Sequence, residues 1–82
     1  MYKDFIKNNI SNLSEDLIKE YAKKVNIPIT TSETHILYQF IMKNYSEILD
    51  GNEKSFSYLK EKLNPNLYYK LYNLYSEYKK YL

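Results

Sequence analysis

The sequence predicts an all-α protein, a compact bundle of about five helices of which three are long. Apolar residues recur every three or four positions, as they do along one face of a helix, and no useful length of the chain alternates like a strand. Helix-capping residues stand in front of several of these apolar runs. Because the chain has only 82 residues, we expect a single helical domain over residues 1–82.

Two helices are expected in the first third of the chain. The first covers about residues 2–10 and has an apolar side that continues past its end, formed by Phe5, Ile6, Ile10 and Leu13. Ser14 then provides an N-cap for the second helix, and Glu15 and Asp16 lie in its first turn, where the helix dipole favours negative charge. The apolar stripe of this second helix consists of Leu17, Ile18, Tyr21, Ala22 and Val25.

A third, long helix follows a break in the pattern. Pro28 disfavours helical backbone at the residue before it, so residues 26–29 are expected to form a short extended connector. Thr30 and Glu33 have the spacing of a capping box. The only glycine, Gly51, stands where a left-handed residue ends a helix. The wide apolar stripe between these signals contains Ile36, Leu37, Phe40, Ile41, Tyr45, Ile48 and Leu49.

Two helices are expected in the remainder of the chain. Asn52 can cap a short fourth helix, whose apolar residues are Phe56, Leu59 and Leu63. Asn64-Pro65 begins the last helix, about residues 65–81, with an N-cap and a proline at the first helical position. This helix has two adjacent apolar stripes, one formed by Leu67, Leu71, Leu74, Tyr78 and Tyr81, and the other by Tyr68, Tyr72 and Tyr75.

The composition excludes several classes of site. The chain has no cysteine, which rules out disulfides, thiolate zinc sites and cysteine nucleophiles. His35 is the only histidine, whereas a catalytic zinc usually has several histidine or carboxylate ligands and a triad requires a nucleophile beside its histidine. One glycine cannot build a glycine-rich phosphate loop. We therefore expect no enzymatic activity, no cofactor and no metal.

Lys, Asn, Ile and Tyr supply 40 of the 82 positions, a bias typical of AT-rich codons. Genomic drift therefore accounts for most of the composition and indicates a bacterium of low GC content. The first residues carry charges, and no stretch approaches the ~20 apolar residues of a membrane span. We expect a cytoplasmic protein without a membrane partner.

Codon bias does not explain why six of the 11 tyrosines lie within residues 68–81. Tyrosine is favoured at protein interfaces because its ring buries a large apolar area while its hydroxyl finds a partner. We therefore predict that the last helix binds a protein partner or a second copy of the chain through Tyr68, Tyr72 and Tyr75. The open alternative is that neighbouring helices bury both stripes.

A second surface is basic. Lys19, Lys23 and Lys24 lie on the second expected helix, and lysines of this kind supply most non-specific affinity for nucleic acids. Acidic residues are interspersed with them and the net charge is only +2, so a solvated face is the simpler interpretation. The sequence thus leaves a nucleic-acid-associated helical module as the alternative function.

One local pattern joins a helix, an extended loop and a second helix. It consists of Leu13-x-x-x-Leu17-x-x-x-Tyr21-Ala22-Lys23-Lys24-Val25-Asn26-Ile27-Pro28-Ile29, then Ile36-Leu37 and Phe40-Ile41. It resembles SAP-like and LEM-like modules, and this resemblance implies binding to DNA or to a protein partner. Ser32-Glu33-Thr34-His35 departs from the pattern, because DNA-binding members usually present a basic residue there.

A second resemblance covers nearly the whole chain. It rests on Phe5-Ile6, Leu13-Ser14-x-x-Leu17, Tyr21-Ala22-Lys23, Ile27-Pro28-Ile29-Thr30 and the closing helix. This order is similar to the YqfT-like family of small proteins from low-GC Gram-positive bacteria. The resemblance implies a bacterial cytosolic helical domain, and it implies no activity or catalytic residue.

Overall fold

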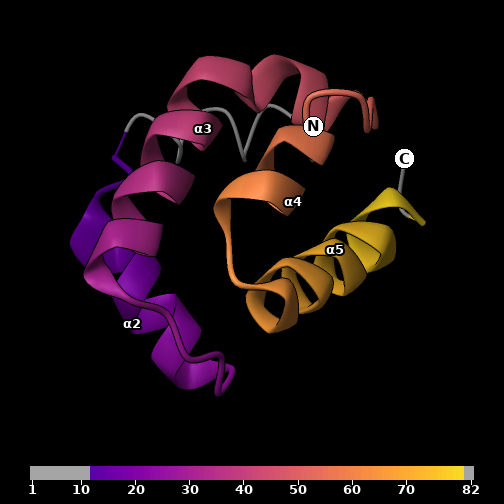
Figure 1. Ribbon diagram of the computed structural model, residues 1–82. Coiled ribbons are helices and arrows are strands. Elements are labelled where there is room, and N and C mark those ends of the chain that lie inside the picture. The colour runs from indigo at the N-terminus through magenta and orange to yellow at the C-terminus, as the bar shows by residue number, and fades with distance from the viewer. Residues whose placement is uncertain (1–11, 81–82) are drawn as a thin grey trace.

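Residues 12–80 of the computed structural model are described here, and they form four helices (Figure 1). In chain order these are α2 (Glu15–Lys24), α3 (Thr31–Leu49), α4 (Ser57–Lys62) and α5 (Pro65–Lys79). Residues 12–80 contain no strand, which confirms the all-α class. The first helix expected from the sequence, at about residues 2–10, lies outside the described residues.

Both ends of α2 are closed by local hydrogen bonds. The Ser14 hydroxyl accepts the Leu17 backbone N–H at 3.1 Å, which confirms the predicted N-cap. At the other end, Asn26 has a left-handed φ of 59°. This conformation lets the Ile27 N–H reach the Ala22 carbonyl at 2.8 Å, the bond that defines a Schellman motif. Helix α2 therefore ends at Lys24, four residues before Pro28.

Helix α3 begins with the predicted capping box. The Thr30 hydroxyl accepts the Glu33 N–H, and Glu33 Oε1 accepts the Thr30 N–H, both at 3.1 Å. The helix ends at Leu49, and Gly51, the residue after the C-cap Asp50, has a φ of 81°, which confirms the left-handed position expected for this glycine. The polar side chain of Thr34 is fully buried, and its hydroxyl donates to the Thr30 carbonyl at 2.8 Å.

The start of α4 differs from the prediction. Asn52 does not cap this helix, because its side-chain oxygen accepts the Lys54 N–H at 3.0 Å and closes a turn instead. A second turn then leads to Phe56, and the helix starts only at Ser57. The predicted apolar residues keep their role nonetheless, since Phe56, Leu59 and Leu63 are all buried.

Helix α5 starts as the sequence predicts. The Asn64 side chain accepts the Asn66 N–H at 2.8 Å, and Pro65 occupies the first helical position. The Asn64 N–H also donates to Glu33 Oε2 at 2.9 Å. This last bond fastens the first turn of α5 to the first turn of α3.

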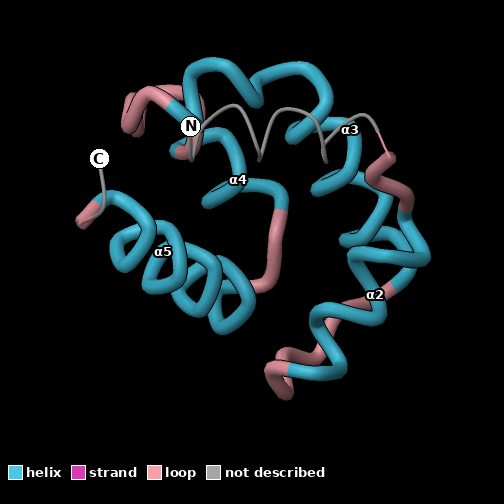
Figure 2. Tube along the Cα trace, turned by 180° about the vertical axis from the view of Figure 1, so that it is seen from behind, coloured by secondary structure: helices cyan, strands magenta, loops and turns pink. Residues whose placement is uncertain are grey.

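The helices follow one another around an arc (Figures 1 and 2). Helix α2 packs on α3, α3 on α4, and α4 on α5, whereas no Cα atom of α2 lies within 8 Å of a Cα atom of α5. The buried side chains of all four helices meet inside the arc. They are Ile18, Ala22, Ile27, Leu37, Phe40, Phe56, Leu59, Leu63, Leu67, Tyr68 and Tyr75.

Candidate functional site

The tyrosine stripe of α5 faces the core. The exposed fractions of Tyr68 and Tyr75 are only 9% and 7%, and Tyr72 is half-buried. All three rings surround Phe56, with ring centres 5.7 Å (Tyr68), 6.1 Å (Tyr72) and 5.1 Å (Tyr75) from its own. The prediction that these tyrosines form an open binding surface is therefore wrong for Tyr68 and Tyr75, because their rings pack on Phe56 in the core.

The hydroxyls of this stripe are also occupied. Tyr75 donates to the Ile48 carbonyl at 2.8 Å, and the neighbouring Tyr78 donates to the Leu49 carbonyl at 3.1 Å. Both acceptors lie in the last turn of α3, where helical carbonyls lack an intrahelical partner. Burial raises the pKa of Tyr75, and the negative charge of Glu53 raises it further, so this hydroxyl stays protonated as a donor.

Glu53 joins the loop between α3 and α4 to the end of α5. Its Oε1 lies 2.9 Å from Lys79 Nζ and accepts the Tyr72 hydroxyl at 3.2 Å. The hydrogen bond from Lys79 is the largest cause that lowers the pKa of this carboxyl, and the Tyr72 bond adds to it. Tyr72, Tyr75 and Tyr78 of α5 therefore all donate their hydroxyls to acceptors within the chain.

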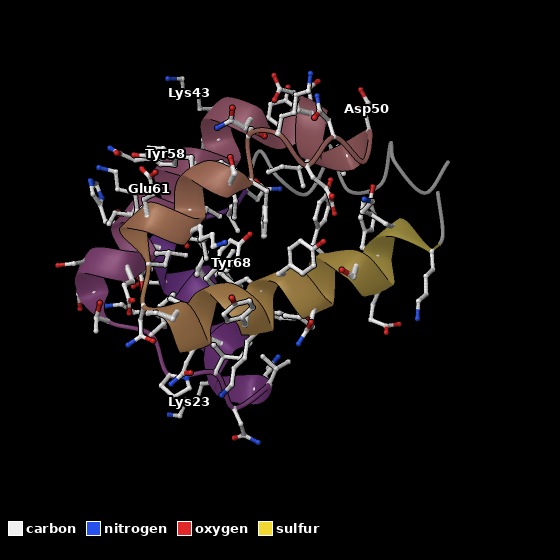
Figure 3. The ribbon with its side chains drawn as sticks, turned by 45° about the vertical axis from the view of Figure 1, so that its right-hand side comes forward. Lys23, Lys43, Asp50, Tyr58, Glu61 and Tyr68 are labelled. Carbon is white, nitrogen blue, oxygen red and sulfur yellow. The ribbon has the colours of Figure 1, made fainter. Side chains whose placement is uncertain are left out.

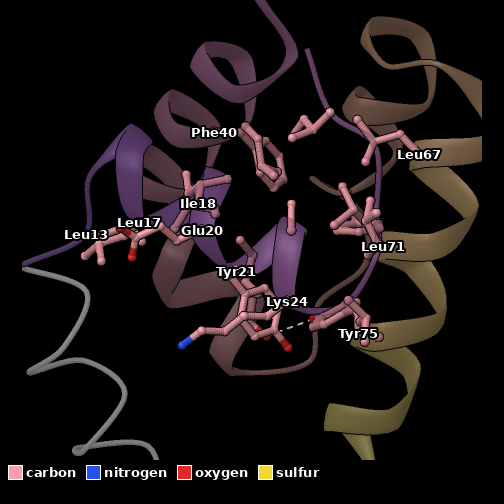
Figure 4. A pocket seen from close by; sticks show the side chains of 18 of the residues that line it. Leu13, Leu17, Ile18, Glu20, Tyr21, Lys24, Phe40, Leu67, Leu71 and Tyr75 are labelled. Carbon is pink, nitrogen blue, oxygen red and sulfur yellow. Dashed lines mark hydrogen bonds between the residues drawn. The ribbon is translucent and has the colours of Figure 1, made fainter. Parts of the chain in front are cut away.

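The other side of α5 faces an apolar groove. Leu67, Leu71 and Leu74 of α5 lie on one wall, and Leu17, Ile18 and Tyr21 of α2 lie on the other (Figure 4). Leu37, Phe40 and Ile41 of α3 form the floor. The groove has a volume of about 610 Å³, within the range of sites that bind ligands in proteins. It is the candidate functional site.

Several walls of this groove are open to solvent. The exposed fraction is 46% for Leu17, 56% for Tyr21 and 38% for Leu74. All three residues line the same groove, and exposed apolar side chains gathered at one groove are a common mark of a binding site. The exposure follows from the fold. Ile18 and Ala22 are the buried residues of α2, and no Cα atom of α5 lies within 8 Å of a Cα atom of α2.

The apolar pattern of residues 17–26 indicates this groove, although the tyrosines of the last helix are the more conspicuous feature of the sequence. Five of the ten positions from Leu17 to Asn26 are apolar or aromatic, which is more than one neighbouring helix can cover. The structure divides that stripe: Ile18 and Ala22 are buried, and Leu17, Tyr21 and Val25 are exposed. The leucine stripe of α5 gave the matching signal on the opposite wall.

The three lysines of the alternative prediction are all exposed on α2. Lys19 Nζ donates to the Thr31 hydroxyl at 3.2 Å. Lys24 lines the groove, while Lys19 and Lys23 line a smaller depression beside it. Figure 3 shows Lys23 at the opposite end of the molecule from Lys43. The lysines thus border the groove rather than a separate flat surface.

Within residues 12–80, no group of three or more histidine, cysteine or carboxylate side chains could hold a metal ion. His35 Nδ1 instead lies 2.9 Å from Glu15 Oε2 and links α3 to α2 on the surface. In the same part of the chain, no helix combines the length and apolar character needed to cross a membrane.

Comparison with known proteins found no matching family model, no matching curated protein and no matching solved structure. The resemblances to the YqfT-like family and to SAP-like and LEM-like modules therefore stay predictions from the sequence.

Proposed function

We propose that the protein is a non-enzymatic interaction module that binds the apolar face of a partner helix in the groove between α2 and α5. One observation carries this proposal: α2 and α5 present apolar side chains to one groove although no Cα atoms of the two helices lie within 8 Å of each other, and residues of the hydrophobic core line the groove. A partner in the groove would extend this core and remove Leu17, Tyr21 and Leu74 from water.

The spacing of the wall residues favours a helix as the occupant. Leu67, Leu71 and Leu74 are four and three residues apart, which makes one ridge along α5. Leu17 and Tyr21 make a shorter ridge along α2. Helices pack by placing such ridges into grooves, and a bound helix usually anchors itself with apolar residues at i, i+3 or i+4, and i+7.

The proposal keeps the last helix as the binding element and changes the side that it uses. The leucine side of α5 replaces the tyrosine side, since Tyr68 and Tyr75 are buried. The compartment, the cytoplasm of a low-GC bacterium, stays part of the proposal and rests on composition alone. The nucleic-acid alternative gains no specific support, because the net charge of the chain is only +2.

The absence of tryptophan allows a direct binding test. A synthetic amphipathic peptide of about 15 residues, long enough to form a helix when bound, would carry one tryptophan on its apolar face. We expect its fluorescence to shift to the blue as the full-length protein is added, because the indole leaves water. A scrambled peptide of the same composition should show no shift.

Two groove variants test where the peptide binds. Leu17→Lys and Leu74→Lys are each expected to weaken binding about tenfold, the effect of roughly 1.4 kcal/mol. Both side chains are already partly exposed, so the fold should survive, and circular dichroism would verify this. Met42→Lys is the matched control, because Met42 is exposed on α3 outside the groove. Equal binding by all three variants would disprove the proposal.

A further inference from the structure

Lysines border the groove on α2 and on α5, and three of them line depressions next to the connector of residues 26–30. Lys24 lines the groove itself. A depression that shares Ala22, Ile27 and Ile29 with the groove is also lined by Lys19 and Lys23. Another depression, which shares Ile29 and Leu67 with the groove, is lined by Lys70 of α5. Lys24 of α2 and Lys70 of α5 therefore bring positive charge to the borders of both walls.

Carboxylates do not balance these lysines. Among residues 12–80, no ion pair involves Lys23, Lys24 or Lys70. Two acidic residues line the same surfaces, Glu20 and Glu33. Both oxygens of Glu33 already accept hydrogen bonds from backbone N–H groups, those of Thr30 and Asn64. Among the described residues that line these three surfaces, Glu20 is the only carboxylate without such hydrogen bonds.

One further carboxylate lies near the aromatic part of the groove. Tyr75 lines the groove, and Tyr72 of the same helix donates its hydroxyl to Glu53. Glu53 is also bound to Lys79, so its charge is largely compensated. Glu53 therefore does little to offset the lysines at the border of the groove.

We infer that the partner is an acidic amphipathic helix, whose apolar stripe fills the groove and whose glutamate or aspartate side chains lie against Lys23, Lys24 and Lys70. This inference rests on the proposed function and adds the chemistry of the partner to it. Opposite charges across an interface steer the partner in and exclude partners of the wrong sign. The lysines thus favour the binding of acidic amphipathic helices over basic ones.

Two peptides that differ only in charge test the inference. Both carry the same apolar face and the same single tryptophan, with glutamates flanking the face in one and lysines in the other. The acidic peptide should bind the full-length protein at least about tenfold more tightly at low salt. This preference should shrink as salt rises, because the Debye length falls from about 10 Å at 0.1 M to about 3 Å at 1 M.

A triple variant tests whether these lysines cause the preference. Lys23→Glu, Lys24→Glu and Lys70→Glu together should abolish or invert the preference for the acidic peptide. The control makes the same change of charge away from the groove, with Lys43→Glu, Lys54→Glu and Lys60→Glu. This control should keep the preference at more than half its original fold-difference.

The outcomes separate the two proposals. If neither peptide binds the unmodified protein, the proposed function is wrong and this inference falls with it. If both peptides bind equally at low salt, the groove still binds helices and only the acidic partner is disproved. An unchanged preference in the triple variant also disproves it.

Other occupants would overturn the inference in distinct ways. A single-stranded DNA that binds more tightly than the acidic peptide, and loses affinity in the triple variant, would make the lysines a nucleic-acid surface. Dimerisation that Leu74→Lys abolishes, stronger than peptide binding, would make a second copy the occupant. A tenfold gain in peptide affinity after Phe5→Ser and Ile10→Ser in the full chain would identify its own first residues as the occupant.

Discussion

Tyr75 stabilises the end of another helix as well as the core. Its ring packs on Phe56, and its hydroxyl donates to the Ile48 carbonyl in the last turn of α3. That carbonyl also accepts the Gly51 N–H, so it would keep one partner if the hydroxyl were lost. The ring and the hydroxyl of this residue can therefore be tested separately.

Tyr75→Phe should lower the free energy of unfolding by about 1 kcal/mol, because one partly buried hydrogen bond is lost while the ring contacts remain. Tyr75→Ala should cost about 3–5 kcal/mol, since it leaves a cavity beside Phe56. Urea denaturation followed by circular dichroism measures both values. Tyr69→Phe is the control, because the Tyr69 side chain is exposed. A Tyr75→Phe protein as stable as the original would show that this hydroxyl contributes nothing.

Glu33 couples the stability of the protein to pH. Partial burial raises the pKa of this carboxyl, but hydrogen bonds from the Asn64 and Thr30 backbone N–H groups and from the Thr30 hydroxyl together lower it below the usual glutamate range. A lowered pKa means that the folded state favours the charged form. The resulting stability is present above the unfolded-state pKa and is lost as pH falls through the folded-state pKa.

Glu33→Gln should therefore be less stable than the original protein at neutral pH, and the difference should vanish once the medium is acidic enough to protonate the glutamate. Thermal unfolding across a pH series measures this convergence. Glu61→Gln is the control, since Glu61 is exposed on α4 (Figure 3), and it should show no such convergence. A constant difference at all pH values would contradict the role of the Glu33 charge.

At the scale of elements, two helices end with the same motif built on different residues. Asn26 closes α2 and Gly51 closes α3, both with positive φ, and each is followed by an N–H that returns to the last full turn. Glycine adopts this backbone without strain, whereas a residue with a Cβ pays for it. The two positions therefore respond in opposite directions to substitution.

Gly51→Ala should destabilise the protein by about 1–2 kcal/mol, because alanine is strained in the left-handed conformation. Asn26→Gly should leave stability unchanged or raise it slightly, since glycine fits the same backbone at least as well. Melting temperatures of the two variants measure the contrast. A Gly51→Ala protein that melts with the original would mean that α3 ends in another way in solution.

The starts and ends of the helices were predictable because their signals are local. Ser14, the Thr30–Glu33 pair and Asn64-Pro65 act within three residues of themselves, and the structure confirms each of them. The cap predicted at Asn52 was wrong, because its side chain accepts the Lys54 N–H and forms a turn before the helix begins at Ser57.

The candidate site was harder to predict because it depends on partners far apart in the sequence. The two stripes of α5 are both apolar, and nothing local shows which one turns inward. Phe56, on the loop before α4, decides this by packing against Tyr68 and Tyr75. Once the tyrosines face inward, the leucines must face α2, and the open groove follows from the distance between the two helices.

At the scale of the whole molecule, only helices that follow each other in the sequence bring their Cα atoms within 8 Å, in the part of the chain that the structure describes. Helices α3 and α5 meet through side chains, such as Tyr75 on the Ile48 carbonyl. The first and last of these helices are left unpaired with each other, so the arc stays open between α2 and α5 (Figure 2). The candidate groove therefore lies between the two helices, α2 and α5, that do not follow each other in the sequence.

The sequential packing of the helices also has a consequence for synthesis on the ribosome. Contacts between neighbouring segments cost little loop entropy, so such topologies fold quickly. The pair of α2 and α3 can form before α5 has emerged, because it needs no residue from that helix to close. Until α5 arrives, Tyr68 and Tyr75 cannot cover Phe56, so its ring stays open to solvent on the nascent chain.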